Sequence, residues 1–165
     1  MTFGETSLNQ ELFELFNESI KLELRVSELY KLFSNALPLD ASFWKRLAME
    51  EENHANLLKA GRDRFGPLGK FPMEMLASSM DELISTSEAI EEIISRCKDI
   101  APSRVDAFNI ALKLEQSAGE LHFLKFMEKD SGSELDKIFQ RLNRGDKDHE
   151  IKIREYMNSH GIKMQ

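Results

Sequence analysis

Two short motifs in this chain place a carboxylate three residues before a histidine, within segments whose apolar periodicity predicts helices. Glu51 precedes His54 in the first motif, and Asp146 precedes His149 in the second. An i, i+3 spacing puts both side chains of a pair on one face of a helix. If that face is turned toward the core, the acid and the imidazole are buried together, which is costly unless something compensates their charge. The fold must therefore bring partners for these groups into one core.

Five helices are predicted from apolar residues that recur at intervals of three and four. The first four span residues 8–34, 41–61, 81–98 and 103–129, and the last begins near a capping box of Ser131 and Glu134 and ends near residue 158. Asp40 is the expected N-cap of the second helix. Glycine and proline residues are concentrated between these segments, above all in residues 62–80, which are predicted to form a connection.

Each long predicted helix carries an ionisable residue in the middle of its apolar stripe. Glu23 and Glu115 stand in the first and fourth helices where leucine would be expected, and carboxylates are rarely buried unless they are paired. A lone acid on two helices and an acid-x-x-His motif on two others is the pattern by which a four-helix bundle binds two metal ions in its core. The predicted metal ligands are Glu23, Glu51, His54, Glu115, Asp146 and His149.

The sequence thus predicts an all-α fold, a ferritin-like four-helix bundle with one long crossover that contains an additional short helix. The whole chain, residues 1–165, is expected to form one domain. The crossover, residues 62–102, would let the second and fourth predicted helices run in the same direction. The chain also resembles two copies of one hairpin, since 28 residues separate Glu23 from Glu51 and 31 separate Glu115 from Asp146.

Several of these interpretations have alternatives. Asp148 is a neighbouring acid, but on a helix it points away from the stripe of His149, so Asp146 is preferred. Tyr30 and His122 each follow a predicted ligand by seven residues, and they are expected either to orient a ligand by hydrogen bonding or to be ordinary core aromatic residues with a polar tip. A buried, hydrogen-bonded polar layer without metal would explain the same stripes.

Composition narrows the class of protein further. The net charge of −7 and the pI near 5.2 argue against a nucleic-acid partner, because a phosphate backbone binds a basic face. No apolar run reaches the length of a membrane span, and the N-terminus lacks the pattern of a secretory signal, so a cytoplasmic location and no membrane partner are expected. Cys97 is the only cysteine, so a cysteine-based metal site is excluded and the thiol is interpreted as a buried apolar group.

At these residues the chain resembles the rubrerythrin branch of the ferritin-like di-iron proteins. The resemblance covers roughly residues 10–158, and four motifs carry it: Glu23-x-x-Val26-x-x-x-Tyr30, Glu51-x-x-His54, Glu115-x-x-Ala118-x-x-x-His122 and Asp146-x-x-His149. It implies that Glu51 and Asp146 bridge the two metals and that each histidine binds one of them. By the same resemblance, Glu23 and Glu115 are terminal ligands.

The chain departs from that family in four respects. It has no rubredoxin domain with paired Cys-x-x-Cys motifs, so an electron donor would be a separate molecule. Ala118 stands where peroxidase-type members have an additional glutamate, His122 stands where tyrosine is more usual, and Asp146 replaces a glutamate. These differences bear on peroxidase activity more than on metal binding.

The leading hypothesis from the sequence is a non-haem di-iron oxidoreductase that reacts with O2 or H2O2 as a ferroxidase or peroxidase. Its cofactor would be two iron ions, and manganese or zinc could use the same carboxylate and imidazole ligands. The alternatives are a protein that binds iron or senses oxidant without turnover, and a metal-free helical interaction protein. We expect a homo-oligomer, with a dimer favoured, because bundles with long apolar helices often associate.

Overall fold

The structure, a computed structural model, describes residues 3–68, 70–76, 79–116, 125–130, 133–142 and 149–165. Every regular element within these ranges is helical, which confirms the predicted all-α class, while the ferritin-like arrangement stays a prediction. The larger helices are α1 (Phe3–Ala36), α2 (Ala41–Ala60), α3 (Met80–Asp99), α4 (Arg104–Glu115), α6 (Glu134–Leu142) and α7 (His149–Ser159). Short helical turns connect them: η1 (Pro38–Asp40), the π-helical η2 (Gly61–Phe65), η3 (Gly66–Leu68) and η4 (Met73–Met75).

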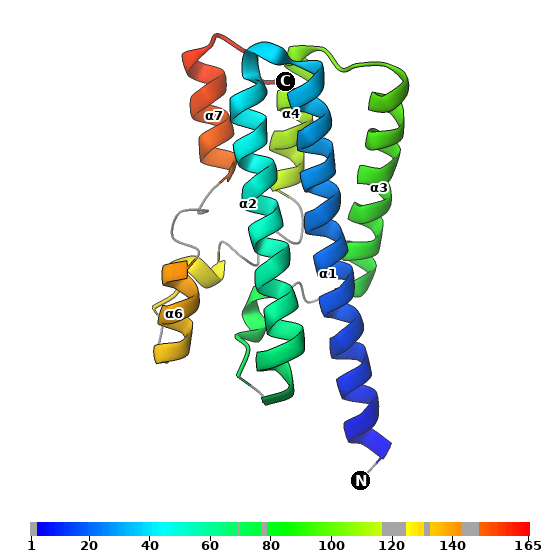
Figure 1. The fold of residues 1–165 in the computed structure, drawn as a ribbon, viewed down its shortest axis with the longest axis vertical. Coiled ribbons are helices and arrows are strands. Elements are labelled where there is room, and N and C mark those ends of the chain that lie inside the picture. Colours follow the sequence, from blue (N-terminus) through cyan, green and yellow to red (C-terminus); the bar gives the residue numbers. More distant parts are fainter. Residues whose placement is uncertain (1–2, 69, 77–78, 117–124, 131–132, 143–148) are drawn as a thin grey trace.

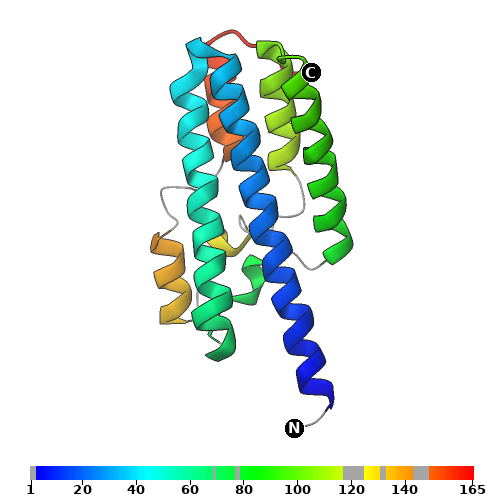
Figure 2. The same cartoon turned by 45° about the vertical axis from the view of Figure 1, so that its right-hand side comes forward.

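The helix α1 lies at the centre of the arrangement, packed against both α2 and α3, while α4 packs against α7 (Figure 1). In Figure 1, α1 and α3 run upward whereas α2 and α4 run downward. The predicted parallel direction of α2 and α4 is therefore observed, because the connection between them includes the whole of α3. The N-terminal turns of α1 extend beyond the other helices in both views (Figures 1 and 2).

The predicted helix boundaries hold for the first half of the chain and fail in the second. The helix α3 agrees with the third predicted helix, residues 81–98, to within one residue at each end, and with 20 residues it is as long as α2. The helix α4 ends at Glu115 instead of continuing to residue 129, because Gln116 has φ −92° and ψ 4° and its N–H is bonded to the carbonyl of Leu114. The single helix predicted over residues 131–158 is represented by two elements, α6 and α7.

The capping predictions also need correction. Asp40 occupies the N-cap position of α2, but its side chain makes no capping hydrogen bond there. Ser131, the expected cap of α6, lies outside the described residues, whereas the hydroxyl of Ser133 accepts a hydrogen bond from the backbone N–H of Asp136. Hydroxyl caps of this type satisfy N–H groups that have no partner within the first turn of a helix.

The core consists of two apolar clusters at different heights along α1 and α2. The upper cluster includes Leu47 and Ala48 of α2, and the lower cluster includes Ala55 and Leu58 of the same helix. The residues of α2 between these two pairs include Glu51 and His54, which are both buried. A polar layer therefore lies between two apolar clusters, where water cannot readily compensate its charges.

One end of the bundle is held together by the buried carboxylate of Asp40. Arg104, the first residue of α4, donates two hydrogen bonds to it, at 2.8 Å from Nε to Oδ2 and 2.7 Å from Nη2 to Oδ1. The hydroxyl of Tyr156 on α7 donates a third, at 2.9 Å to Oδ1. The start of α2 is thereby tied to α4 and α7 by charge-assisted bonds, which are stronger than neutral ones.

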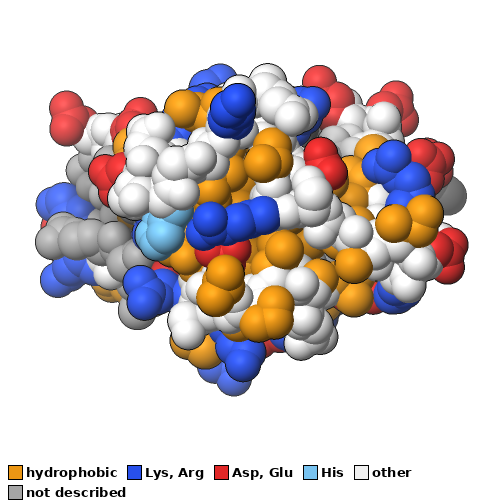
Figure 3. Space-filling model, turned by 90° about the horizontal axis from the view of Figure 1, so that it is seen from above, with side chains coloured by type: hydrophobic (Ala, Val, Ile, Leu, Met, Phe, Trp, Pro, Cys, Tyr) orange, Lys and Arg blue, Asp and Glu red, His pale blue; other side chains and the backbone are white. Residues whose placement is uncertain are grey.

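The outer surface of this end exposes apolar side chains. Leu39, in the turn between α1 and α2, is 91% exposed, and Ile100, just after α3, is 79% exposed. Viewed from above, several hydrophobic patches lie around a basic side chain at the middle of this face (Figure 3). None of the helices in the described part of the chain combines the length and the apolar character that a membrane span requires.

Candidate metal centre

Five of the six predicted metal ligands meet in the polar layer of the core. Glu23 comes from α1, Glu51 and His54 come from α2, Glu115 is the last residue of α4, and His149 is the first residue of α7. They form two groups of three, with all ligand atoms of a group within 4.8 Å of one another. We name these groups the Glu23 cluster (Glu23, Glu51, His54) and the Glu115 cluster (Glu51, Glu115, His149).

Glu51 belongs to both clusters because its two oxygen atoms face different histidines. Oε2 lies 3.3 Å from Nδ1 of His54, and Oε1 lies 2.9 Å from Nδ1 of His149. The two imidazole rings are nearly parallel, at 18°, with their centroids 5.5 Å apart. A carboxylate that presents one oxygen to each of two neighbouring clusters has the geometry of a bridging ligand.

Each cluster is completed by a second carboxylate. Oε2 of Glu23 lies 3.7 Å from Nδ1 of His54, and Oε2 of Glu115 lies 3.5 Å from Nδ1 of His149. Glu51 is completely buried, and Glu115 and both histidines are at most 3% exposed. The ligand atoms therefore converge on two adjacent positions that the protein shields from water.

Although these carboxylate and imidazole atoms lie close together, most of them do not form directed hydrogen bonds. Within the part of the chain that the structure describes, neither oxygen of Glu51 and neither ring nitrogen of His149 has a hydrogen bond of acceptable geometry. The same is true of Oε2 of Glu23. Buried polar atoms are rarely left in this state, and each such case calls for an explanation such as an ion. Carboxylate and imidazole groups that converge in this way fit a divalent cation such as iron, manganese or zinc.

The pKa values of the acids differ according to their position in the layer. Burial raises the pKa of Glu23 to about 7, although the nearby imidazole of His54 opposes this shift. Burial likewise raises the pKa of Glu115, against the opposing charge of His149. Burial also acts to raise the pKa of Glu51, but the nearby imidazoles of His149 and His54 outweigh it and hold that pKa below its usual range.

The histidines respond in the opposite direction. Burial lowers the pKa of His54, but Glu23 and Glu51 outweigh burial and hold the pKa well above its usual value. For His149, burial is outweighed in the same way, chiefly by the charges of Glu51 and Glu115. Protonated imidazoles therefore compensate the buried carboxylates when no ion is bound, and a metal ion would replace those protons.

Tyr30 contacts the site in the way that its predicted role of orienting a ligand by hydrogen bonding requires. Its hydroxyl donates a hydrogen bond to Oε1 of Glu115, while the other carboxylate oxygen of Glu115 faces His149. Tyr30 is fully buried, so this hydrogen bond is shielded from water. The contact fixes the direction in which Glu115 presents its free oxygen to the Glu115 cluster.

Three of the candidate site residues considered in the sequence interpretation lie outside the described residues. They are His122, the second predicted orienting residue, Asp146, the sixth predicted ligand, and Asp148, the neighbouring acid. Their roles stay predictions.

Sequence reasoning missed Glu50, which contacts the site from the opposite edge of His149. Oε2 of Glu50 lies 2.9 Å from Nε2 of His149 and 2.8 Å from Nζ of Lys152. Burial acts to raise the pKa of Glu50, but His149 and Lys152 outweigh it and hold the pKa below its usual range. The only sequence signal was weak: Lys152 follows His149 by three residues and so shares its helix face.

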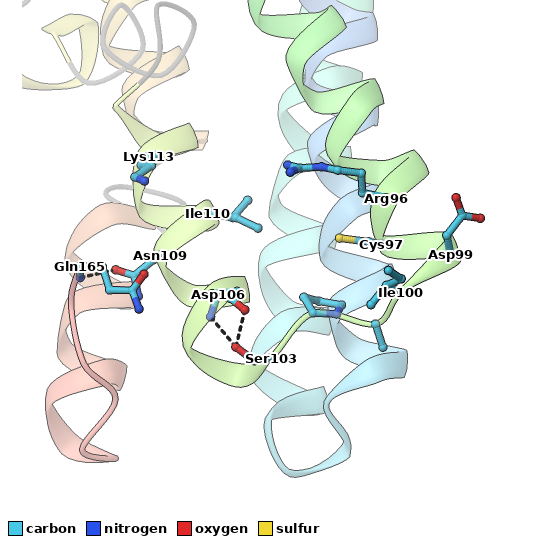
Figure 4. A pocket seen from close by; sticks show the side chains of 12 residues that line it. Arg96, Cys97, Asp99, Ile100, Ser103, Asp106, Asn109, Ile110, Lys113 and Gln165 are labelled. Atoms are coloured by element: carbon cyan, nitrogen blue, oxygen red, sulfur yellow. Dashed lines mark hydrogen bonds between the residues drawn. The ribbon is translucent and has the colours of Figure 1, made fainter.

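A cavity of about 510 Å³ lies elsewhere, between the end of α3 and one side of α4 (Figure 4). Its walls include Arg96, Cys97, Ile100, Asn109, Ile110 and Lys113, and none of the five ligands described above. Cys97, expected to be a buried apolar group, is instead partly exposed at this cavity. The side chains that line this cavity do not converge on one point. The buried polar layer is therefore the candidate metal centre.

A scan against protein-family models found no match, and searches of the curated proteins and of the solved structures found none either. The case for a function therefore rests on the residues of this chain and their geometry.

Proposed function

We propose that this protein binds two divalent metal ions in the polar layer, one in each cluster, and acts as a non-haem di-iron oxidoreductase of the rubrerythrin type. The observation that carries the proposal is the position of Glu51, whose two buried oxygens face two different histidines. A single cation site would need only one of these orientations. A polar layer that only fixes helix register would instead be expected to direct its hydrogen bonds at its own members.

Charge supports two ions in preference to one. Glu23, Glu51, Glu115 and Asp146 would together carry four negative charges when ionised, and two divalent cations carry four positive charges. The pKa of Glu23, about 7, falls when a cation binds nearby, because an adjacent positive charge favours the ionised carboxylate. Neutral imidazoles then complete each cluster without adding charge. The ligand set is therefore balanced for two divalent ions if Asp146 is the fourth carboxylate.

When bound, a pair of iron ions supplies the two electrons with which O2 or peroxide is reduced. The residues of this chain set the conditions for that chemistry. Glu51 would fix the separation of the two ions, and Tyr30 holds Glu115 in one orientation. The apolar clusters above and below the layer exclude bulk water from it. Electrons would come from a separate donor, because the chain contains a single cysteine and so no second redox centre of the rubredoxin type.

One observation favours a second candidate, a metal-free polar layer in a helical interaction protein. His54 and His149 have raised pKa values and can compensate the carboxylates as cations themselves. In that case the layer would only specify how the helices are aligned. Iron binding without turnover is the intermediate case, and the replacement of an expected glutamate by Ala118 supports it.

The first test is metal content after anaerobic reconstitution with Fe(II). We expect about two iron ions per chain, as in other di-iron bundles, and a visible absorption of ferric ions after O2 or H2O2 is added. Glu51→Gln should lose both ions, whereas Glu52→Gln, which makes the same change at a partly exposed neighbour ion-paired with Lys31, should keep them. Absence of stoichiometric metal from the unmodified protein would overturn the proposal. Binding without steady turnover with H2O2 and a reductant would support the iron-handling alternative.

A further inference from the structure

The two acids that flank Glu51 on α2 point to different parts of the molecule. Glu52 faces α1, where it forms an ion pair with Lys31. Glu50 faces α7, where its Oε2 lies 2.9 Å from Nε2 of His149 and 2.8 Å from Nζ of Lys152. Glu50 is only 8% exposed, although its partner Lys152 reaches the surface. Glu50 is therefore a nearly buried carboxylate in contact with a predicted metal ligand, and this contact indicates a role for Glu50 at the candidate metal centre.

Glu50 cannot serve as a further ligand to the ion of the Glu115 cluster through this contact. The Nδ1 atom of His149 faces Glu51 and Glu115, and Nε2 is on the far side of the same ring. A neutral imidazole that binds a metal through one nitrogen carries its proton on the other. With Nδ1 on the metal, the proton is on Nε2, and the acceptor in reach is Glu50.

We propose that Glu50 is a positioning residue: when an ion occupies the Glu115 cluster, its 2.9 Å contact with Nε2 of His149 becomes a directed hydrogen bond that holds Nδ1 toward that ion. Lys152 holds the Glu50 carboxylate in place through its own ion pair. Carboxylate–histidine–metal arrangements of this kind fix the orientation of the ring and raise its affinity for the metal. This inference rests on the proposed metal centre and assigns Glu50 and Lys152 to one of its two ions.

The geometry predicts a selective effect. Glu50 contacts His149, a member of the Glu115 cluster only, whereas the Glu23 cluster uses His54. Loss of the Glu50 carboxylate should therefore lower the affinity for one ion and leave the affinity for the other almost unchanged. Glu52→Gln is the matched control, because it removes one acid next to Glu51 and breaks one ion pair with a lysine without touching a histidine.

The experiment is a titration of the unmodified protein, Glu50→Gln and Glu52→Gln with Co(II), which does not turn over and reports each binding step by its visible absorption. We expect Glu50→Gln to lose about 10- to 100-fold in affinity for one of two ions, the range typical of partners that orient a metal-bound histidine. Proton NMR of the Co(II) forms should show an exchangeable imidazole N–H whose exchange with water is faster in Glu50→Gln. Glu52→Gln should match the unmodified protein in both measurements.

Two results would overturn the inference while leaving the proposed function intact. One is that Glu50→Gln binds both Co(II) ions with the same affinities as Glu52→Gln. The other is that Glu50→Gln loses affinity for both ions to the same extent. Failure of the unmodified protein to bind Co(II) would instead overturn the proposed function and this inference with it. Lys152→Met provides a second variant in case Glu50→Gln does not fold. It should lower the affinity for the same one of the two ions. Unchanged affinities in Lys152→Met would contradict the assignment.

Discussion

The carboxylate of Glu51, in the middle of α2, lies 2.9 Å from Nδ1 of His149, the residue with which α7 begins. These residues are 98 positions apart in the chain, and their contact joins the two halves of the molecule at the polar layer. The other oxygen of Glu51 faces His54 on its own helix. One buried carboxylate therefore connects the Glu51-x-x-His54 motif on α2 with His149 on α7.

Metal binding should stabilise the folded chain. A ligand that binds only the folded state raises the free energy of unfolding by about 2.7 kcal/mol when its free concentration is 100 times its Kd. We expect Fe(II) or Co(II) to raise the melting temperature of the unmodified protein and a chelator to reverse the rise. The melting temperature of Glu51→Gln should not respond to metal. An identical response of the two proteins would place the bound metal elsewhere.

The pH dependence of stability should change sign when metal binds. In the metal-free protein, His54 and His149 have raised pKa values, so their stabilising charge is fully present below about pH 6.5, the unfolded pKa, and is lost as the pH rises through the folded values. Glu23, with its pKa raised to about 7, acts in the same direction, because its neutral form is the one favoured in the fold. The metal-free protein should therefore become less stable from about pH 6 to pH 8.

Metal binding reverses this slope because the ion replaces the protons of both imidazoles. Affinity then rises with pH, and so does the stability measured at a fixed metal concentration. Melting curves at several pH values, with chelator and with Co(II), provide the comparison. Calorimetry in buffers of different ionisation enthalpy should also detect protons released on binding. Parallel slopes with no proton release would show that the imidazoles are not ligands.

Tyr30→Phe should affect both stability and metal affinity. The variant removes the hydroxyl that donates to Oε1 of Glu115, which costs about 1–2 kcal/mol of folding free energy for a buried acceptor. It also frees Glu115 to rotate, so the affinity for the ion of the Glu115 cluster should fall. Urea unfolding and Co(II) titration measure the two effects separately.

Tyr156→Phe is the matched control for that variant. Tyr156 also donates a hydrogen bond to a buried carboxylate, but the acceptor is Asp40 at the end of the bundle. This change should cost stability and leave both metal affinities unaltered. If the two tyrosine variants changed metal affinity equally, the effect would come from general loosening of the bundle and not from Glu115.

Asp40→Asn should destabilise the end of the bundle by about 1.5–3 kcal/mol, the usual range for hydrogen bonds to a charged group. Burial acts to raise the pKa of Asp40, but Arg104 and Tyr156 outweigh it and hold the pKa below its usual value. The contribution of the carboxylate is therefore present above the unfolded pKa, about 3.9, and is lost as the pH falls through the folded pKa. Urea denaturation from neutral to acidic pH should show a constant difference between the two proteins down to about pH 4, which shrinks as the pH falls further through the folded pKa. A difference that did not shrink with falling pH would contradict an ionic role.

Local patterns predicted the first half of the molecule well. The three- and four-residue spacing within residues 41–61 predicts one core-facing stripe, and every residue of that stripe is buried in α2: Trp44, Leu47, Ala48, Glu51, His54, Ala55 and Leu58. The predicted third helix, residues 81–98, differs from α3 by one residue at each end. Such agreement is expected where a sustained 3.6-residue period fixes which face is buried. The early end of α4 was not predicted, because an apolar stripe continues past Glu115 in the sequence.

The sequence by itself determined the residue types of the candidate centre and the helix faces that carry them, because i, i+3 spacing and apolar periodicity are properties of a single helix. Only the tertiary structure decided that Glu51 faces both histidines, that Tyr30 bonds Glu115, and that Glu50 approaches His149 from its far edge. These relations depend on how α2 is rotated and placed against α4 and α7. Neighbours on different helices have no fixed spacing in the sequence, so packing alone sets which side chains meet.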